Sequence, residues 1–332
     1  MSNAPASPKG AAVAAPRFGL GNWRQYVIYV GFVAIFLIFA ATLYDKGFLD
    51  PNNLLNIGRQ TAMIAIMAVA MTFVLSAGEI DLSIGMVAGL ASLTTAMAMD
   101  AWGLPAGVLA GLATGLVVGV VNGTLTTRVG IPSFLTTLAM MGIARGVAMW
   151  ATQTKSVPIL DDNYIAVFGG KDFFHFPVLL IWMVVIAVAG HVVLRKTTFG
   201  RRVLATGGSE TAARYSGVDT ASIKMRVLVI SSMAACLAGM LYAGRLHSGR
   251  FQLGEGDELS VIAAAVLGGT SLFGGAGSMV GTVAGSVMLG ALANILQLNN
   301  INAALQLLAT GAIIVLAAVL QSLVRRREGV SR

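Results

Sequence analysis

Charged residues are rare along this chain, and the long intervals between them predict membrane-spanning helices. The 332 residues include only 22 Lys and Arg and 14 Asp and Glu. A helix needs about 20 mostly apolar residues to cross a bilayer. Intervals close to that length, with no charge or a single one, are found at 25–44, 60–78, 82–99, 101–127, 131–152 (which contains Arg145), 178–194 and 227–244.

The interval between Glu258 and Arg325 contains no charge and is long enough for several spans. Glycine-rich residues 268–277 and polar residues 299–302 divide it, which predicts a short or broken eighth span and two full ones. We therefore expect an all-α, polytopic membrane protein with about ten transmembrane helices over residues 25–324. Residues 1–24 and the basic residues 325–332 are expected to be tails, and the first span is long enough to be retained rather than cleaved.

The composition supports a membrane protein and indicates its orientation. Charged residues make up 11% of the chain, against roughly 25% in soluble domains. An even number of spans places both termini on one side. If that side is the cytoplasm, the inner segments 1–24, 76–82, 126–130, 195–226 and 325–332 hold 15 of the 22 Lys and Arg residues, as the positive-inside rule requires. The same rule explains the net charge of +8 without a nucleic-acid partner.

No catalytic, metal or nucleotide motif is present in the sequence. Cys236 is the only cysteine and lies in an apolar run, where we expect it to be buried. The histidines at 175, 191 and 247 lack metal-ligand spacing. Gly170 and Lys171 are followed by Asp172, so they do not complete a phosphate-binding loop. If the function requires ATP and Mg²⁺, another subunit must bind them, and no cofactor is expected on this chain.

Glycines recur at four-residue intervals, which predicts close helix packing. Such spacing aligns them on one helical face and lets backbones approach each other. Lining of a narrow pathway is the alternative. We call each such series of glycines a ladder. Two ladders are followed by an asparagine, Asn122 in one and Asn294 in the other. The two helices that contain them are expected to run in opposite directions, which is compatible with an inverted repeat. The ladders are Gly111, Gly115 and Gly119; Gly277, Gly281 and Gly285; and the shorter pair Gly85 and Gly89.

Two polar segments interrupt the apolar sequence and are candidates for the translocation pathway. Ionisable groups at membrane depth are costly and often functional, which applies to Glu79 and Asp81 in SAGEIDLSIG. The alternative is a solvated turn in which Asp81 or Ser83 caps the next helix. Irregular backbone at 267–278 requires protein or a watery cavity around it. The candidate pathway residues are Glu79, Asp81, Ser83, Asn122, Gly268, Gly269 and Thr270.

The longest inner segment, 195–226, has two interpretations. Its seven cations suit a solvated loop beside anionic lipid headgroups. Within it, a short stretch between Gly208 and Gly217 is able to form a helix, with Ser209 as its cap and Ala212 and Ala213 at its centre. Small residues on a short cytoplasmic helix also form a surface on which another protein docks.

Three ordered motifs resemble a known family: AGEIDLSIG, TGGSETAARYSGVD and GDELSVIAAAVLGGTSLFGGAGSMVGT. Together they are similar to the ribose/xylose/arabinose-type permeases of bacterial ABC sugar importers, over residues 25–325. The resemblance implies a multi-pass permease of the inner membrane, not an enzyme, that works with a cytoplasmic ATPase, a periplasmic binding protein and a second permease copy. It also implies that the long inner loop carries a coupling helix that docks on the ATPase.

One residue departs from the coupling pattern that importer permeases generally show, Glu-Ala-Ala followed after three residues by Gly. Ala212, Ala213 and Gly217 match it, but Thr211 displaces Glu210. The predicted coupling residues are Gly208, Glu210, Ala212, Ala213 and Gly217.

The competing class is a secondary carrier driven by an ion gradient through Glu79 and Asp81. The chain lacks both a nucleotide site and an outer solute-capturing domain, which favours a partner-dependent importer. The sequence leaves open which sugar or related solute is carried, and whether two identical or two different permeases pair.

Overall fold

The computed structural model describes residues 33–34, 36–170, 172–173 and 176–299, together with residues 301, 302, 304, 305, 308, 311, 312, 315 and 319. The tails 1–24 and 325–332 lie outside the described residues, as do part of the first predicted span and most of the last one. Within this part of the chain, seven helices are long and apolar enough to cross a membrane. The chain is therefore a mostly helical, multi-pass membrane protein, whereas ten spans and the inverted repeat remain predictions.

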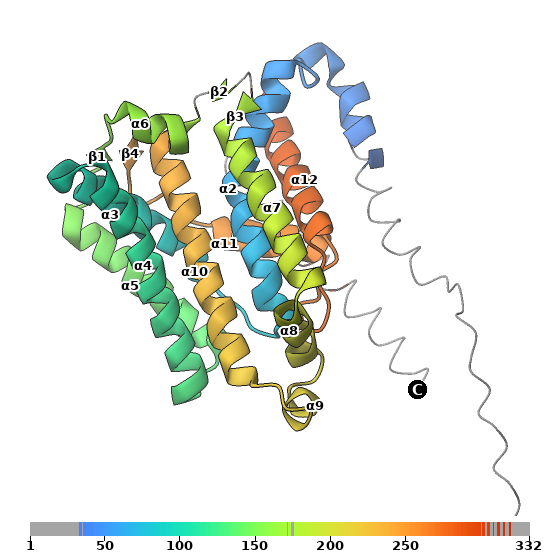
Figure 1. Ribbon diagram of the computed structural model, residues 1–332. Coiled ribbons are helices and arrows are strands. Elements are labelled where there is room, and N and C mark those ends of the chain that lie inside the picture. The colour runs from blue at the N-terminus through green and yellow to red at the C-terminus, as the bar shows by residue number, and fades with distance from the viewer. Residues whose placement is uncertain are drawn as a thin grey trace, which may run out of the picture.

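The helices run up and down in one bundle (Figure 1). In chain order, the structure contains η2 (Tyr44–Lys46), α2 (Pro51–Ser76), α3 (Ile84–Trp102), α4 (Leu104–Thr124), η3 (Leu125–Val129), α5 (Ser133–Thr152), β1 (Val157–Pro158), α6 (Asp162–Tyr164), η4 (Ile165–Gly169), β2 (Asp172–Phe173), β3 (Phe176–Pro177), α7 (Val178–Lys196), α8 (Thr198–Gly208), α9 (Glu210–Tyr215), α10 (Thr220–Arg245), β4 (Ser248–Gly249), α11 (Asp257–Leu267) and α12 (Met279–Leu298).

Side-chain caps explain why α2 and α10 begin earlier than the charge pattern indicates. The Asp50 carboxylate accepts a hydrogen bond from the amide of Asn52, and Pro51 occupies the first helical position of α2. Asp219 caps α10 in the same way, so residues 220–226 are helical rather than part of the inner loop. The eighth predicted span is the short helix α11, which ends at Leu267 before the irregular residues 268–278.

Three helices form the buried centre of the bundle. Most residues of α2, α3 and α10 are buried, whereas most residues of α4, α5 and α7 are half-buried or exposed. Such an exposed apolar surface suits contact with lipid or with another membrane subunit. The core therefore lies along α2, α3 and α10, with α12 and α11 packed on the other side of α2.

Glycines allow α4 to pack closely on α10. A Cβ atom built on Gly115 would lie 2.6 Å from the sulfur of Cys236, and one on Gly119 would lie 2.7 Å from the Cα of Val229. Gly281 and Gly285 of α12 similarly contact Gly268 and Ala264 of α11 and the turn after it. The packing role predicted for these two ladders is confirmed, as is the burial of Cys236.

The two ends of the bundle differ. The only strands in the described residues are two-residue strands, which form the antiparallel pairs β1–β4 and β2–β3. Both pairs lie at the end opposite α8 and α9 (Figure 1). We call these the strand end and the α9 end.

Candidate functional site

A short helix pair, α8 and α9, projects at the α9 end. The Ser209 hydroxyl accepts a hydrogen bond from the amide of Ala212, 3.3 Å away, which confirms the predicted cap. Gly217 ends α9 with a φ of 81°, and the amides of Gly217 and Val218 bond back to the carbonyls of Arg214 and Ala213. A left-handed residue at this position is the usual helix stop and favours glycine.

The exposed face of α9 differs from the predicted one. Ala212 and Gly217 are exposed, but Ala213 is buried, with only 5% of its surface accessible. The expectation that Ala213 faces a partner is therefore wrong, because this side chain packs inside the chain's own fold. Tyr215 is 89% exposed and was missed in the sequence, although an aromatic residue beside a predicted docking helix is a recognisable signal.

Glu210 has a defined structural role despite its displacement from the coupling pattern. It accepts hydrogen bonds from Arg214, one turn later in α9, at 2.7 Å and from Thr220 of α10 at 3.3 Å. Its other oxygen lies 2.8 Å from the Lys224 ammonium. The hydrogen bond from Lys224 and the charges of Lys224 and Arg214 hold the pKa of Glu210 below its ordinary value, so this carboxylate is ionised at neutral pH.

Lys224 joins α9 to the turn between α2 and α3. Its ammonium nitrogen lies 2.8 Å from Glu79 Oε1 as well as 2.8 Å from Glu210 Oε2. The side chains of Lys224 and Glu79 are only 19% and 9% exposed. One cation therefore bridges two carboxylates from segments far apart in sequence. The sequence did not identify Lys224 because no local pattern reveals a pairing across more than a hundred residues.

The turn at 77–83 is fixed by hydrogen bonds to its neighbours. Asp81 Oδ1 accepts from the amide of Ser83 at 2.9 Å and from its hydroxyl at 2.6 Å. The Asn122 amide of α4 donates to the same hydroxyl at 3.1 Å. The structure thus brings together three predicted pathway residues from two segments, and all three are fully buried.

The predicted capping of α3 is wrong in detail. Ser83 is the N-cap residue, but neither it nor Asp81 accepts a hydrogen bond from the first turn of the helix. Asp81 instead stabilises the turn that precedes α3. Asp81 Oδ2 faces Ser231 of α10 and has no hydrogen-bond partner of good geometry among the described residues.

The irregular segment 268–278 forms a second buried cluster. Gly268 packs on Gly281, and Gly269 has a φ of 90°. The Thr270 hydroxyl lies 3.5 Å from that of Thr282, which is 2.8 Å from Thr72 of α2. These residues lie in a different segment from Asp81 and Ser83, so the predicted pathway residues come from two irregular regions of the chain and from Asn122 of α4.

Three segments meet beside α8. The amide of Gly275 donates to the carbonyl of Ser76 at 3.0 Å. Gly274 packs directly against Gly207 at the end of α8. Gly207 also contacts Ser76. The α8–α9 unit is therefore in contact with both irregular segments. Within the described residues, no group of His, Cys, Asp or Glu is arranged to hold a metal ion.

The comparisons with known proteins place this architecture in a transport family. Residues 53–318 match the family described as the permease component of branched-chain amino acid transport systems, and the chain belongs to that family. The resemblance to ribose- and arabinose-type permeases is confirmed by individual relatives.

Two relatives illustrate that resemblance. The ribose import permease protein of Bacillus subtilis (strain 168) is 40% identical over 292 residues, which cover 87% of this chain and 91% of the relative. The L-arabinose transport system permease protein of Escherichia coli (strain K12) is 38% identical over 321 residues, which cover 96% of each chain. No solved structure matches the chain.

Proposed function

We propose that the chain is the transmembrane permease subunit of an ABC importer and forms the pathway for a monosaccharide or a related small polar solute. The relatives named for ribose and arabinose import support this solute class. The chain itself is a transport subunit, and ATP and Mg²⁺ belong to a separate ATPase.

The α9 end is the cytoplasmic, ATPase-facing end in this proposal. Cations concentrate there, as expected of inner segments: Arg128, Arg195, Lys196, Arg201, Arg202, Arg214, Lys224 and Arg226. Both termini are cytoplasmic in the same scheme. The strand end then faces the periplasm, where a binding protein delivers the solute. A second permease copy, identical or homologous, completes the membrane unit.

The double ion pair of Lys224 is the observation that carries the coupling mechanism. α9 docks on the ATPase through its exposed residues Ala212 and Tyr215, while Glu210 faces inward. Movement of α9 displaces Lys224 and, through it, Glu79 in the turn between α2 and α3. Gly208 and Gly217 delimit the moving helix.

The two buried clusters are the parts of the pathway that respond to this movement. The turn holding Asp81 and Ser83 is bonded to Asn122, and Gly268, Gly269 and Thr270 lie in the segment that packs on α8. Hydrogen-bonded clusters of this kind have discrete arrangements, so a shift of α8 and α9 opens or closes the inner end of the pathway.

The test is ATP-driven uptake in proteoliposomes containing this chain with its partner ATPase and binding protein. We expect D-ribose or L-arabinose to enter only when ATP is supplied on the α9 side. A proton or sodium gradient without ATP should drive no uptake. Uptake that follows an ion gradient and ignores ATP would contradict the proposal and favour the secondary-carrier class.

A further inference from the structure

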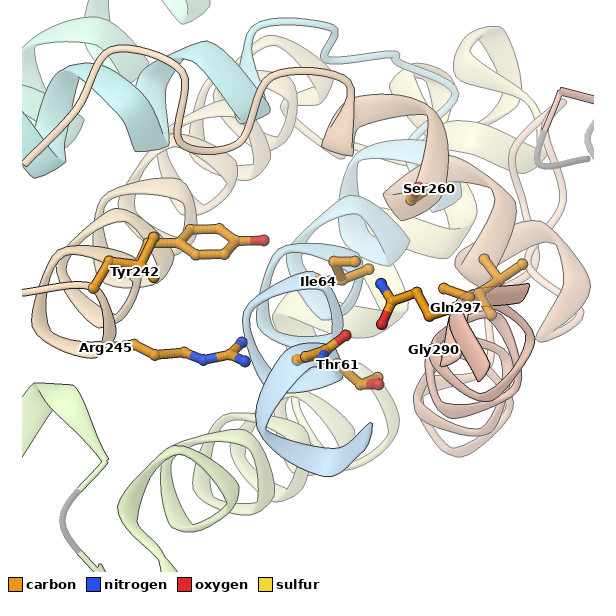
Figure 2. A pocket seen from close by; sticks show the side chains of 11 residues that line it. Thr61, Ile64, Tyr242, Arg245, Ser260, Gly290 and Gln297 are labelled. Atoms are coloured by element: carbon orange, nitrogen blue, oxygen red, sulfur yellow. The ribbon is translucent and has the colours of Figure 1, made fainter. Parts of the chain in front are cut away.

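A polar cavity lies toward the strand end of the bundle, away from the residues discussed so far. It has a volume of about 420 Å³, within the range of small-molecule sites. Figure 2 shows side chains from four helices around it. The polar residues that line it are Gln60 and Thr61 of α2, Tyr242 and Arg245 of α10, Ser260 of α11 and Gln297 of α12.

The cavity reaches well into the membrane-spanning layer. Thr61 lies about 15 Å along α2 from its start at Pro51, given a rise of about 1.5 Å per residue. At that level Thr61 contacts Gly290 of α12. Polar side chains at such depth face the protein interior or water and commonly mark solute pathways.

Several of these polar groups remain available to a ligand. Figure 2 shows Tyr242 and Arg245 pointing from one side toward Gln297 on the other. The Tyr242 hydroxyl donates to Asp257 Oδ2 at 2.7 Å, so its oxygen is oriented and can still accept a hydrogen bond. Gln60, Arg245 and Gln297 form no hydrogen bond or ion pair with another of the described residues.

The lining matches an uncharged, polyhydroxylated solute. Glutamine amides both donate and accept hydrogen bonds, as sugar hydroxyls do, and the guanidinium adds donors. Ile64, Leu246 and Leu289 supply apolar surface for the C–H groups of a sugar ring. The lining includes no carboxylate that would pair with the ammonium group of an amino acid.

A second large cavity among the described residues provides a contrast. Its lining is apolar and comes from α2, α4, α7 and α10 together with Phe168 of η4, and it includes Trp182 of α7. The one polar group of Trp182, its indole N–H, already donates to the carbonyl of Val167 at 2.9 Å. That cavity offers no hydrogen bonds to a hydroxylated solute.

We infer that the polar cavity is an outer solute site, which holds a monosaccharide-sized polyol after its release from the binding protein and before the inner end opens. The inference rests on the proposed transport function and names the residues that recognise the solute. Gln60, Arg245 and Gln297 make the direct contacts, and Asp257 acts through Tyr242.

Accessibility of introduced cysteines tests the site directly. Gln60→Cys and Gln297→Cys, each in a Cys236→Ala background, should react with a small membrane-impermeant thiol reagent added at the strand end. D-ribose or L-arabinose at millimolar concentration should slow that reaction several-fold, whereas L-leucine should not. Gln252→Cys, an exposed residue outside the cavity, should react equally with and without sugar, and Ser209→Cys at the α9 end should not react.

Uptake provides the second measurement. Gln60→Leu combined with Gln297→Leu should lower ATP-driven sugar uptake about tenfold, because two hydrogen bonds to the solute are lost. Assembly with the ATPase and ATP hydrolysis should be retained. Normal uptake in this variant, or protection by L-leucine in place of sugars, would overturn the assigned site while leaving the transport function intact. Failure of the wild-type complex to import any member of a panel of pentoses, hexoses and sugar alcohols with ATP would instead contradict the proposed function itself.

Discussion

Lys224 and Asp81 show how differently two ionisable residues inside the bundle are stabilised. Lys224 lies between two carboxylates, of which Glu79 is buried, so removing the lysine leaves Glu79 without its counter-charge. Asp81 has no ion-pair partner and depends on two hydrogen bonds from Ser83. We therefore expect neutral substitutions at these two positions to affect stability and transport differently.

Asp81→Asn should fold and transport at close to the wild-type rate. The amide oxygen of Asn accepts both bonds from Ser83, and the NH₂ group replaces an oxygen that has no partner of good geometry. Asp81→Leu should lower stability by about 1–3 kcal/mol, because the buried Ser83 groups lose their acceptor. Thermal unfolding in detergent and uptake in proteoliposomes would compare the two variants. A folded but inactive Asp81→Asn variant would show that the charge itself acts in the pathway.

The sequence revealed the polar residues but not how they are connected. Asp81, Ser83 and Asn122 could be selected because polar groups are conspicuous in apolar spans. Their hydrogen bonds depend on how α4 packs against the turn, which local sequence does not specify. The same limit applies to Lys224, whose position on α10 gains meaning only through Glu79 and Glu210, and to the cavity, whose lining comes from four separate helices.

At the scale of elements, α9 combines an inward and an outward face within a single short helix. Glu210 and Ala213 face the rest of the chain, whereas Ala212 and Tyr215 are exposed. The sequence correctly placed a short helix between Gly208 and Gly217 with Ser209 as its cap, and its docking role stays a prediction. The sequence could not assign the faces, because a helix of six residues leaves the direction of each side chain to its packing.

Ala212→Trp should reduce ATP-driven uptake severely while leaving the isolated permease as stable as wild type. The added ring projects from the exposed face and would obstruct docking of the ATPase. Ala213→Trp should destabilise the permease itself, because overpacking of a buried site typically costs about 1–3 kcal/mol. Thermal unfolding of the permease and co-purification of the ATPase separate the two effects. Normal ATPase binding by a folded Ala212→Trp variant would exclude this face from the interface.

At the scale of the whole molecule, the two ends of the bundle have separate tasks in this account. The polar cavity lies toward the strand end. The helix α9 lies at the opposite end (Figure 1), where both irregular segments contact α8. The long central helices α2 and α10 contribute residues to both ends: Gln60 and Ser76 from α2, Lys224 and Arg245 from α10. A movement imposed at α9 therefore acts directly on elements that also line the solute cavity.

The number of sugar molecules imported per ATP hydrolysed tests this coupling most directly. The measurement compares wild-type complex with Lys224→Met, Lys224→Arg and Arg226→Met in proteoliposomes, with Glu79→Gln combined with Lys224→Met to remove the unpaired buried charge. Arg226 is the matched control, because it is an exposed cation at the same end of α10 and forms no ion pair with another described residue.

The account predicts that Lys224→Met, alone or with Glu79→Gln, still assembles and hydrolyses ATP but imports at least about tenfold less sugar per ATP, since the bridge between α9 and the 77–83 turn is lost. Lys224→Arg should restore much of the ratio, and Arg226→Met should leave it unchanged. A wild-type ratio in the assembled, folded double variant would contradict the account.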